Sequence, residues 1–396
     1  MISFAELVGN STVVLLDGGL GTTLEDYVGL EISQSPLWSA QPIASASEEI
    51  MKAHLLFLRA GAKILSTSTY QCSVETFQAA GFDSELAKSL MLKSVLIATK
   101  AREIFEAESI QAGFPLQNPT IIALSLGPFG AILKPTQEFR GFYPPPYGPL
   151  EYSDDHINHN SFKENESKQE ADAIDALTQF HYERLLVYAS SVNTWKSIDC
   201  IAFETVPLKR EVIAIRHAIQ LLHTWIVKRG GEMKPWWISC VFPDGNSPAE
   251  LLPDGPKISI DGMLDAAFSE MGESNGRLPT PSGFGINCTK PEYLPALAAS
   301  TVGYFKAHLD KLISKPWLII YPNGNDVYDE ETRSWVGKSQ GSHINWANEV
   351  GNLVMELPTG NNVIGGVVVG GCCKTGPEHI SSLRSKRRSL NFFPQF

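Results

Sequence analysis

The sequence has few cysteines, no long hydrophobic run and no excess of positive charge. Its 396 residues include six cysteines, too few for the disulfide framework of a small secreted protein, so clustered ones suit metal ligation or catalysis better. No segment approaches the ~18 uninterrupted apolar residues that span a membrane, and the N-terminus lacks the basic segment and apolar core of a secretory signal. The net charge of −11 argues against nucleic acid or an anionic membrane as partner. We therefore expect a cytoplasmic globular protein.

Short apolar runs recur along the chain and predict the fold. Each run is continuous rather than alternating, as in strands buried on both faces of a parallel sheet. The eight runs cover residues 12–19, 62–68, 120–128, 200–205, 236–242, 283–288, 317–323 and 363–372. Segments with helical spacing lie between them, and the one over residues 84–108 has Ser84 as a candidate N-cap. Eight strand–helix units in a chain of this length indicate an α/β protein with a (β/α)₈ barrel of the TIM type.

A doubly wound open sheet is the alternative fold. The presence of eight strand–helix units disfavours this fold. The glycines at the end of the first run, at positions 18, 19 and 21, also disfavour it, because they miss the G-x-G-x-x-G spacing of a dinucleotide-binding turn. We expect a single domain over residues 1–396, with insertions after the third and fifth strands. The first insertion has a Pro/Tyr-rich half that suits an ordered lid and a charged, Asn/Ser-rich half. We therefore expect a flexible stretch at about 150–173.

Three cysteines are expected at one rim of this barrel, where the C-terminal ends of the strands form the active site. Cys288 ends the sixth run, and Cys372 and Cys373 end the eighth. Because one strand lies between them, we expect the strand ends within about 10 Å of each other. Three thiolates suit Zn²⁺ and leave a fourth tetrahedral position for water or substrate, which is typical of a catalytic site. From the spacing alone, buried small apolar residues are an equally good interpretation, and we favour it for the remaining cysteines.

The residues around these cysteines resemble a known family. "GFGINCTKPEYL" (283–294) and "GGCCKTGPEHI" (370–380) are similar to the two zinc-ligand motifs of the homocysteine S-methyltransferases. The similarity continues, in order, through "LLDGGLGTTLE", "SPLWSA", "LSTSTYQCS", "SLGPFGAIL", "QFHYERL" and "FETVPLKRE". It covers nearly the whole chain apart from the insertions. The resemblance implies an enzyme that methylates homocysteine to methionine, with one Zn²⁺ per chain.

The resemblance also assigns the principal site residues. It implies that Cys288, Cys372 and Cys373 bind zinc and that the homocysteine thiol takes the fourth position. Coordination to zinc removes the proton of a thiol, and only the thiolate is a competent nucleophile. Asp17 and Glu204 match the family positions that hold the ammonium group of the amino acid.

Further substrate contacts are expected at the same rim. The N–H groups of Gly18 and Gly19 can approach the substrate carboxylate, because glycine lets a backbone come close to a ligand. We also expect Thr67 and Asn287, which lie at the ends of the second and sixth runs, among the substrate-binding residues.

The methyl donor is inferred from an aromatic residue. Trp38 lies in "SPLWSA", which resembles the branch of the family that uses S-methylmethionine or S-adenosylmethionine more than the branch that uses betaine. A sulfonium cation over an indole face gains roughly 0.5–2 kcal/mol. Phe129 and the "EFRGFYPPPYG" lid are expected to close over this donor. Ordinary packing is the alternative interpretation of Trp38.

Two other functions are compatible with these residues. Asp17 and Glu204 require only an amino acid, so the acceptor could instead be another thiol or selenol, such as selenohomocysteine or selenocysteine. A non-catalytic zinc-binding barrel is the second alternative, and an open three-thiolate site argues against it. We expect small-molecule partners and a monomer or small homo-oligomer. The sequence leaves the preferred sulfonium and the oligomeric state open.

Overall fold

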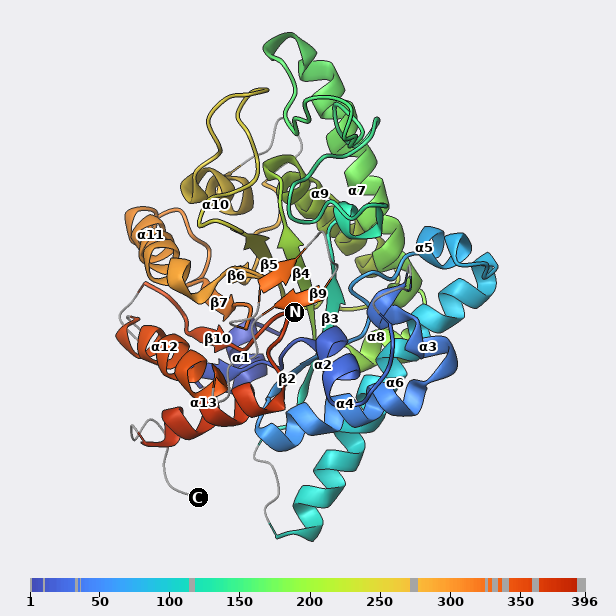
Figure 1. The fold of residues 1–396 in the computed structure, drawn as a ribbon, viewed down its shortest axis with the longest axis vertical. Coiled ribbons are helices and arrows are strands. Elements are labelled where there is room, and N and C mark those ends of the chain that lie inside the picture. The colour runs from blue at the N-terminus through green and yellow to red at the C-terminus, as the bar shows by residue number, and fades with distance from the viewer. Residues whose placement is uncertain are drawn as a thin grey trace.

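A barrel of eight parallel strands forms the centre of the molecule, with helices around it (Figure 1). The computed structural model describes residues 2–9, 11–32, 35, 37–113, 118–270, 277–324, 327–329, 334–336, 342–357 and 363–389. The barrel strands are β1 (Val13–Leu15), β2 (Ile64–Ser66), β3 (Ile121–Leu126), β4 (Cys200–Val206), β5 (Trp236–Val241), β6 (Gly283–Asn287), β7 (Trp317–Tyr321) and β10 (Val367–Val369). They pair in the order β1-β10-β7-β6-β5-β4-β3-β2, and a parallel bridge from Leu16 to Ile64 joins β1 to β2. The predicted (β/α)₈ barrel is confirmed.

Helices surround the barrel and begin and end at recognisable caps. They are α1 (Phe4–Val8), α2 (Leu20–Asp26), α3 (Pro42–Ser45), α4 (Ser47–Ala60), α5 (Val74–Ala79), α6 (Ser84–Gln111), α7 (Ser167–Ala189), α8 (Val192–Ser197), α9 (Lys209–Val227), α10 (Ile260–Phe268), α11 (Leu294–Ala307), α12 (Ser342–Glu356) and α13 (Pro377–Ser389). The predicted N-cap of α6 was wrong by one residue, because the carboxylate of Asp83 accepts the N–H of Leu86 at 2.8 Å. No helix in the described ranges is long and apolar enough to cross a membrane.

Two short elements lie outside this barrel plan. Between β7 and α12, β8 (Val327–Asp329) and β9 (Ser334–Val336) pair antiparallel. Short 3₁₀ turns cover Trp38–Ala40, Phe129–Ile132, Glu164–Glu166 and Pro291–Tyr293.

The inside of the barrel is filled by side chains that alternate along each strand. The inward-facing apolar residues form one buried cluster, which includes Val14, Leu16, Ile121, Ala123, Cys200, Ala202, Trp237, Trp317, Ile319, Tyr321 and Val368. Phe4 of α1 packs edge-on against Trp237 and Trp317, with ring centroids 5.9 and 5.3 Å apart. Helix α1 therefore joins the apolar filling, and the barrel is a packed core rather than a pore.

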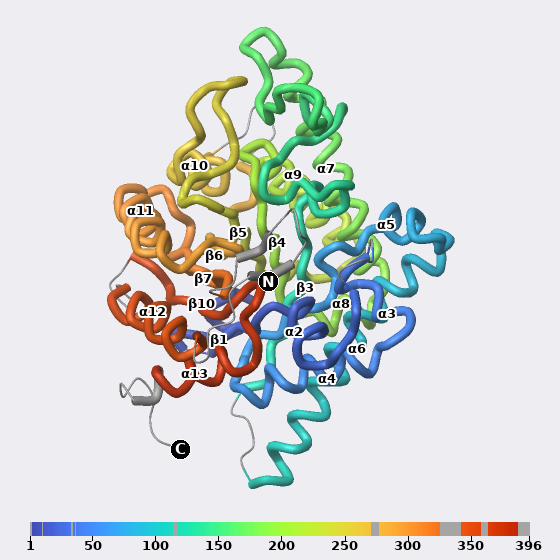
Figure 2. Tube along the Cα trace, in the orientation of Figure 1, coloured from blue at the N-terminus to red at the C-terminus, as the bar shows by residue number. Residues whose placement is uncertain are grey.

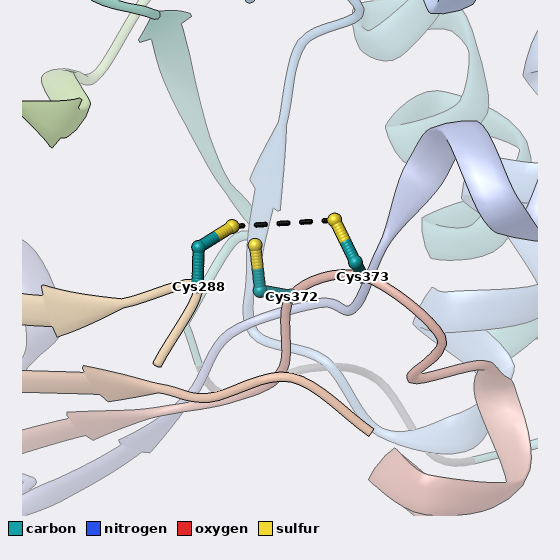
Figure 3. Close-up of side chains that lie close together, drawn as sticks. All are labelled: Cys288, Cys372 and Cys373. Atoms are coloured by element: carbon teal, nitrogen blue, oxygen red, sulfur yellow. Dashed lines mark hydrogen bonds between the residues drawn. The ribbon is translucent and has the colours of Figure 1, made fainter. Parts of the chain in front are cut away.

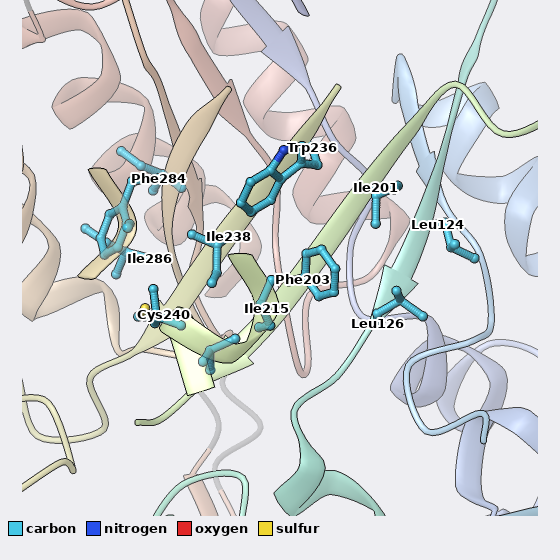
Figure 4. Packing of buried hydrophobic residues seen from close by; sticks show 14 of the residues in the cluster. Leu124, Leu126, Ile201, Phe203, Ile215, Trp236, Ile238, Cys240, Phe284 and Ile286 are labelled. Carbon is cyan, nitrogen blue, oxygen red and sulfur yellow. The ribbon is translucent and has the colours of Figure 1, made fainter. Parts of the chain in front are cut away.

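The outward faces of the strands pack against the helices in the largest buried cluster of the described residues. Figure 4 shows part of this layer, in which Phe203, Trp236, Ile238 and Phe284 lie side by side on β4, β5 and β6. Burying one such side chain contributes about 1.5–3 kcal/mol. The cysteines outside the rim are also fully buried in the protein core, as we expected: Cys72, Cys200 and Cys240.

The two insertions lie against each other at one end of the molecule (Figures 1 and 2). The side-chain amide of Asn160 donates to the carbonyl oxygens of Arg140 and Pro248, at 2.7 and 2.9 Å. The N–H of Glu250 donates back to Asn160 Oδ1 at 3.0 Å. Asn160 thus joins the segment after β3 to the segment after β5. Flexibility at 150–173 stays a prediction, and α7 begins inside this range, at Ser167.

A buried carboxylate fixes the segment after β3 to the outer helices. Glu211 of α9 accepts hydrogen bonds from the N–H of Phe129 at 2.6 Å and the hydroxyl of Tyr143 at 2.7 Å. The Nε2 atom of His181 on α7 lies 3.0 Å from the same carboxylate. His181 is therefore a structural partner of Glu211, and it is not part of the described group of potential metal ligands.

Candidate metal and substrate site

Three cysteine sulfur atoms converge at the C-terminal rim of the barrel. Cys288 follows β6, and Cys372 and Cys373 follow β10. Their Sγ atoms all lie within 4.8 Å of one another, and those of Cys288 and Cys373 are 4.0 Å apart (Figure 3). Among the residues that the structure describes, this is the one group of three or more potential ligands that could hold a metal ion.

The geometry of the three sulfur atoms fits a tetrahedral metal. Zinc binds thiolate sulfur at about 2.3 Å, which places two sulfur ligands about 3.8 Å apart in a tetrahedron. The 4.0 Å between Cys288 and Cys373 differs from this by a few tenths of an ångström. Both Cys372 and Cys373 remain partly exposed, so a fourth ligand can reach the ion from the rim. The cluster therefore fits an open three-thiolate site.

The backbone around the cysteines is held in uncommon conformations. Cys288 has a φ of 48°, and a left-handed backbone at a residue other than glycine costs about 1–3 kcal/mol. A Cβ on Gly370 would lie 2.5 Å from the carbonyl oxygen of Asp17, and a Cβ on Gly371 would lie 2.1 Å from Thr375 Oγ1. These two glycines thus allow the turn that carries the cysteine pair to pack directly on β1 and on Thr375.

The thiols share protons. Hydrogen bonds from Cys288 and Cys372 lower the pKa of Cys373 well below its ordinary value. Hydrogen bonds with the other two thiols raise the pKa of Cys288. The cluster therefore favours a thiolate at Cys373, and thiolates are the form that binds metals. Binding a metal would release the remaining protons.

Two buried carboxylates lie at the same rim. Asp17, which follows β1 and is 2% exposed, accepts hydrogen bonds from the N–H of Ser66 at 2.7 Å and from its hydroxyl at 3.0 Å. Glu204 of β4 is 7% exposed and accepts a hydrogen bond from the hydroxyl of Ser125. Burial raises the pKa of both groups to about 7, and the charge of Glu204 adds to the rise at Asp17. Two buried carboxylates that repel each other suit a cationic ligand.

Asn287 connects the substrate rim to the cysteines. Its side-chain amide donates to Thr205 Oγ1 at 2.7 Å, and its oxygen accepts the N–H of Thr205 at 2.8 Å. The same amide nitrogen lies 4.0 Å from Cys372 Sγ. Thr205 has a φ of 59° at an irregularity in the pairing of β4 with β5. This pairing fixes the Asn287 amide so that it faces Cys372.

The remaining predicted substrate contacts are already engaged within the protein. The hydroxyl of Thr67 accepts the N–H of Ser125 at 3.1 Å. The N–H of Gly19 donates to the carbonyl oxygen of Thr375 at 2.9 Å. A Cβ on Gly18 would lie 2.2 Å from that same oxygen, so both glycines are needed for close packing. Their contacts with substrate stay predictions.

The two aromatic residues predicted to face the donor have different surroundings. Trp38 has a φ of 40° and is partly buried. Its indole ring packs closely on Gly21, so that a Cβ added at Gly21 would lie 2.4 Å from the ring. Phe129 is 5% exposed and stacks on Tyr147 with ring centroids 3.9 Å apart. Phe129 also contacts Tyr143 edge-on, at 5.3 Å. Contact of either residue with a donor stays a prediction.

A family model described as homocysteine S-methyltransferase matches residues 14–387. This chain belongs to the homocysteine S-methyltransferase family. Homocysteine S-methyltransferase 2 of Zea mays is 32% identical over 384 residues, which is 96% of this chain and 91% of that protein. Homocysteine S-methyltransferase 2 of Arabidopsis thaliana is 28% identical over 98% of each chain. The family resemblance read from the motifs is confirmed, and the protein is a methyltransferase.

Solved structures agree with the fold of this family member. The oxidised form of the homocysteine methyltransferase MmuM from Escherichia coli superposes with a TM-score of 0.64 at 25% identity, over 96% of this chain and 98% of that one. The metallated form of MmuM gives a TM-score of 0.63 at 24% identity over the same shares.

Sequence reasoning assigned no role to several polar residues at or near the methyltransferase site. Ser66 and Ser125, which bind the two carboxylates, stand at or near the ends of β2 and β3. The alternation of inward-facing residues along β3, which places Ser125 two residues after Ala123, could have identified it. Glu138 was quoted only as part of the lid, yet its carboxylate Oε2 is buried. No strand or helix pattern covers that residue, and the burial of this oxygen atom could therefore not be predicted from the sequence.

Proposed function

We propose that the protein transfers a methyl group from a sulfonium donor, S-methylmethionine or S-adenosylmethionine, to the thiolate of L-homocysteine, forming methionine. The observation that carries the proposal is the meeting of three cysteine thiols with the buried carboxylates of Asp17 and Glu204 at one rim. The thiols suit a metal that activates the acceptor sulfur, and the carboxylates suit the ammonium group of an amino acid. Relatives named as homocysteine S-methyltransferases, one of them 32% identical, support the acceptor.

The proposed cofactor is one Zn²⁺ per chain, held by Cys288, Cys372 and Cys373. Such an ion would keep a fourth thiol deprotonated at neutral pH and so present it as a nucleophile. The MmuM structure described as metallated supports a metal in this family. Three cysteine thiolates carry more negative charge than the ion neutralises, and this keeps the substrate sulfur electron-rich. The amide of Asn287, 4.0 Å from Cys372 Sγ, restrains the orientation of that ligand.

Asp17 and Glu204 bind the substrate ammonium in this proposal. A cation between them lowers the pKa of both and keeps both ionised. They need not act as general acids. The methyl group forms its new bond to the homocysteine sulfur as its bond to the sulfonium sulfur breaks, and the departing sulfur keeps the electron pair. The product of the donor is then a neutral thioether, which requires no proton.

The sulfonium donor is proposed to lie near Trp38 and Phe129. An indole face stabilises a neighbouring cation by roughly 0.5–2 kcal/mol, and Trp38 is only partly buried. The N–H groups of Gly18 and Gly19 and the side chains of Thr67 and Asn287 complete the proposed substrate contacts.

Methylation of a selenol amino acid is a second candidate. The selenocysteine Se-methyltransferase of Brassica oleracea var. italica is 29% identical over 95% of this chain. The selenocysteine methyltransferase of Astragalus bisulcatus is 27% identical over 96%. The carboxylates of Asp17 and Glu204 would bind the ammonium group of either acceptor. Direct competition between homocysteine and selenocysteine distinguishes the two.

We further propose that residues 1–396 form a single domain that acts in the cytoplasm on small molecules, as a monomer or small homo-oligomer.

The test is methionine formation by zinc-loaded protein, with each sulfonium donor in parallel. Cys373→Ala is expected to abolish both zinc binding and turnover. Cys240→Ala, which removes a buried thiol from the same barrel but not from the rim, should keep one equivalent of zinc and its turnover. Zinc bound by the unmodified protein without turnover from any donor would refute the reaction, and zinc retained by Cys373→Ala would refute the metal site.

A further inference from the structure

Glu138 is held at the rim by the turn that follows the Phe129–Ile132 segment. The N–H of Gln137 donates to the carbonyl oxygen of Gly130 at 2.8 Å, and the N–H of Gly141 donates to the carbonyl oxygen of Gln137 at 2.7 Å. A Cβ on Gly130 would lie 2.8 Å from the backbone nitrogen of Glu138, so the two halves of the turn are in direct contact. The position of Glu138 is therefore fixed by backbone contacts on both sides.

The carboxylate of Glu138 lies near enough to the cysteine cluster for Cys372 to contribute to its raised pKa, and it lacks the hydrogen-bond partners of the other site carboxylates. Its Oε2 atom is buried and accepts no hydrogen bond from any described residue. Burial raises the pKa of Tyr70, and the charge of Glu138 adds to this rise. Asp17 and Glu204, by contrast, both accept hydrogen bonds from serine residues. Glu138 thus adds to the site a carboxyl group that can take up a negative charge and whose Oε2 atom has no partner among the described residues.

A carboxylate with one oxygen atom buried and without a hydrogen-bond partner, as Glu138 Oε2 is, is unfavourable in the free protein. Burial, with a smaller contribution from Cys372, raises the pKa of Glu138 to about 8. Replacing such a group by a neutral one normally stabilises a fold, so a ligand is the natural explanation for a charge in this place. Metal ligation does not explain the presence of Glu138. The three cysteines have ligand atoms within 4.8 Å of one another, and Glu138 does not belong to this group.

We propose that the Glu138 carboxylate binds a positive charge of the methyl donor. This inference rests on the proposed function, in which Asp17 and Glu204 already take the ammonium group of the acceptor. The donor carries the cationic groups that remain, its sulfonium and its own ammonium. Glu138 then makes the site select cationic donors, and it neutralises part of their charge while leaving the acceptor thiolate reactive.

The test compares Glu138→Gln with Glu138→Asp and with a matched control. Glu138→Gln keeps the size of the side chain and removes its charge. Glu151→Gln makes the same change at an exposed position of the same insertion. The expected result is a rise in the KM and the calorimetric Kd of S-methylmethionine of roughly tenfold or more in Glu138→Gln, a smaller rise in Glu138→Asp and no change in Glu151→Gln. The KM of homocysteine and the bound zinc should stay the same in all three.

A second donor identifies the charge that is bound. Dimethylsulfoniopropionate is a sulfonium without an ammonium group. If its KM rises equally in Glu138→Gln, the carboxylate binds the sulfonium. If only S-methylmethionine is affected, the carboxylate binds the ammonium. Both results support the proposal.

Three results would overturn the role of Glu138: an unchanged donor KM and Kd, an equal rise in the KM of homocysteine, or loss of zinc. Absence of turnover in the unmodified protein would instead refute the proposed function, so the two failures are distinguishable.

Discussion

Replacing Asp17 by asparagine is expected to weaken homocysteine binding while leaving the metal site intact. The substitution preserves shape, and the N–H of Ser66, which donates to Asp17 at 2.7 Å, can still donate to the oxygen of the new amide. The hydroxyl of Ser66 can rotate to accept from the amide NH₂. The local fold should therefore survive, and the main loss is one negative charge beside the substrate ammonium.

The size of the effect follows from the pair of carboxylates. Removing one partner of a buried, hydrogen-bonded charge pair costs about 2–5 kcal/mol. Glu204 remains to bind the same ammonium, so we expect the lower end, about 2 kcal/mol, which corresponds to a roughly 30-fold rise in the KM of homocysteine. The donor KM and the zinc content should stay unchanged.

The assay is initial-rate kinetics with each substrate varied in turn, together with metal analysis of the purified variant. Asp172→Asn, at an exposed position of α7, is the control. A homocysteine KM within twofold of that of the unmodified protein would refute the assignment of Asp17 to the ammonium. A parallel rise in the donor KM would show that Asp17 does not distinguish acceptor from donor.

Two further predictions concern pH and the cysteine turn. Burial raises the pKa of Asp17 and Glu204 to about 7 from ordinary values near ~4. Between about pH 4 and 7 the folded protein therefore binds more protons than the unfolded chain. Because of this difference, the contribution of the two carboxyl groups to the free energy of unfolding should fall as pH rises through that window. The ammonium needs them ionised, so the KM of homocysteine should decrease from pH 6 to 8, and less steeply in Asp17→Asn; a flat profile in the unmodified protein would contradict this. Gly371→Ala places a Cβ 2.1 Å from Thr375 Oγ1 and should displace the turn that carries the cysteine pair, lowering zinc affinity by about tenfold or more, as measured by competition with a chelator. Gly303→Ala, where a Cβ meets no atom within 4 Å, should leave zinc affinity unchanged, and equal affinity in both variants would refute the reasoning.

Much of the fold and part of the site could be predicted from the sequence, because both depend on strand ends. All eight barrel strands overlap the predicted apolar runs, since strands buried on both faces leave continuous apolar sequence. The convergence of Cys288 with Cys372 and Cys373 followed from their positions after the sixth and eighth strands.

Features fixed by long-range contacts could not be predicted. The burial of the Glu138 Oε2 atom depends on how the turn at Gly130 folds back on itself, and no periodic pattern covers this residue. The partner of His181 lies 30 residues away on another helix. The need for glycine at position 371 is also a long-range effect: its backbone does not adopt a positive φ, and Thr375 packs so closely against it that a Cβ would not fit.

The position of the cysteine pair has a consequence for the order in which the protein is made. Strand β10 pairs with both β1 and β7, so Cys372 and Cys373 directly follow the strand that completes the barrel. A ribosome releases Asp17, Glu204 and Cys288 well before this pair, and the metal site cannot assemble until the last strand is in place. An ion there would link Cys288 to Cys373, which are 85 residues apart. A covalent link between residues at that separation stabilises a fold by about 4–5 kcal/mol, because it lowers the conformational entropy of the unfolded chain. Completion of the barrel and acquisition of the metal are therefore coupled. A chain whose synthesis stops before β10 has neither a closed barrel nor a complete metal site.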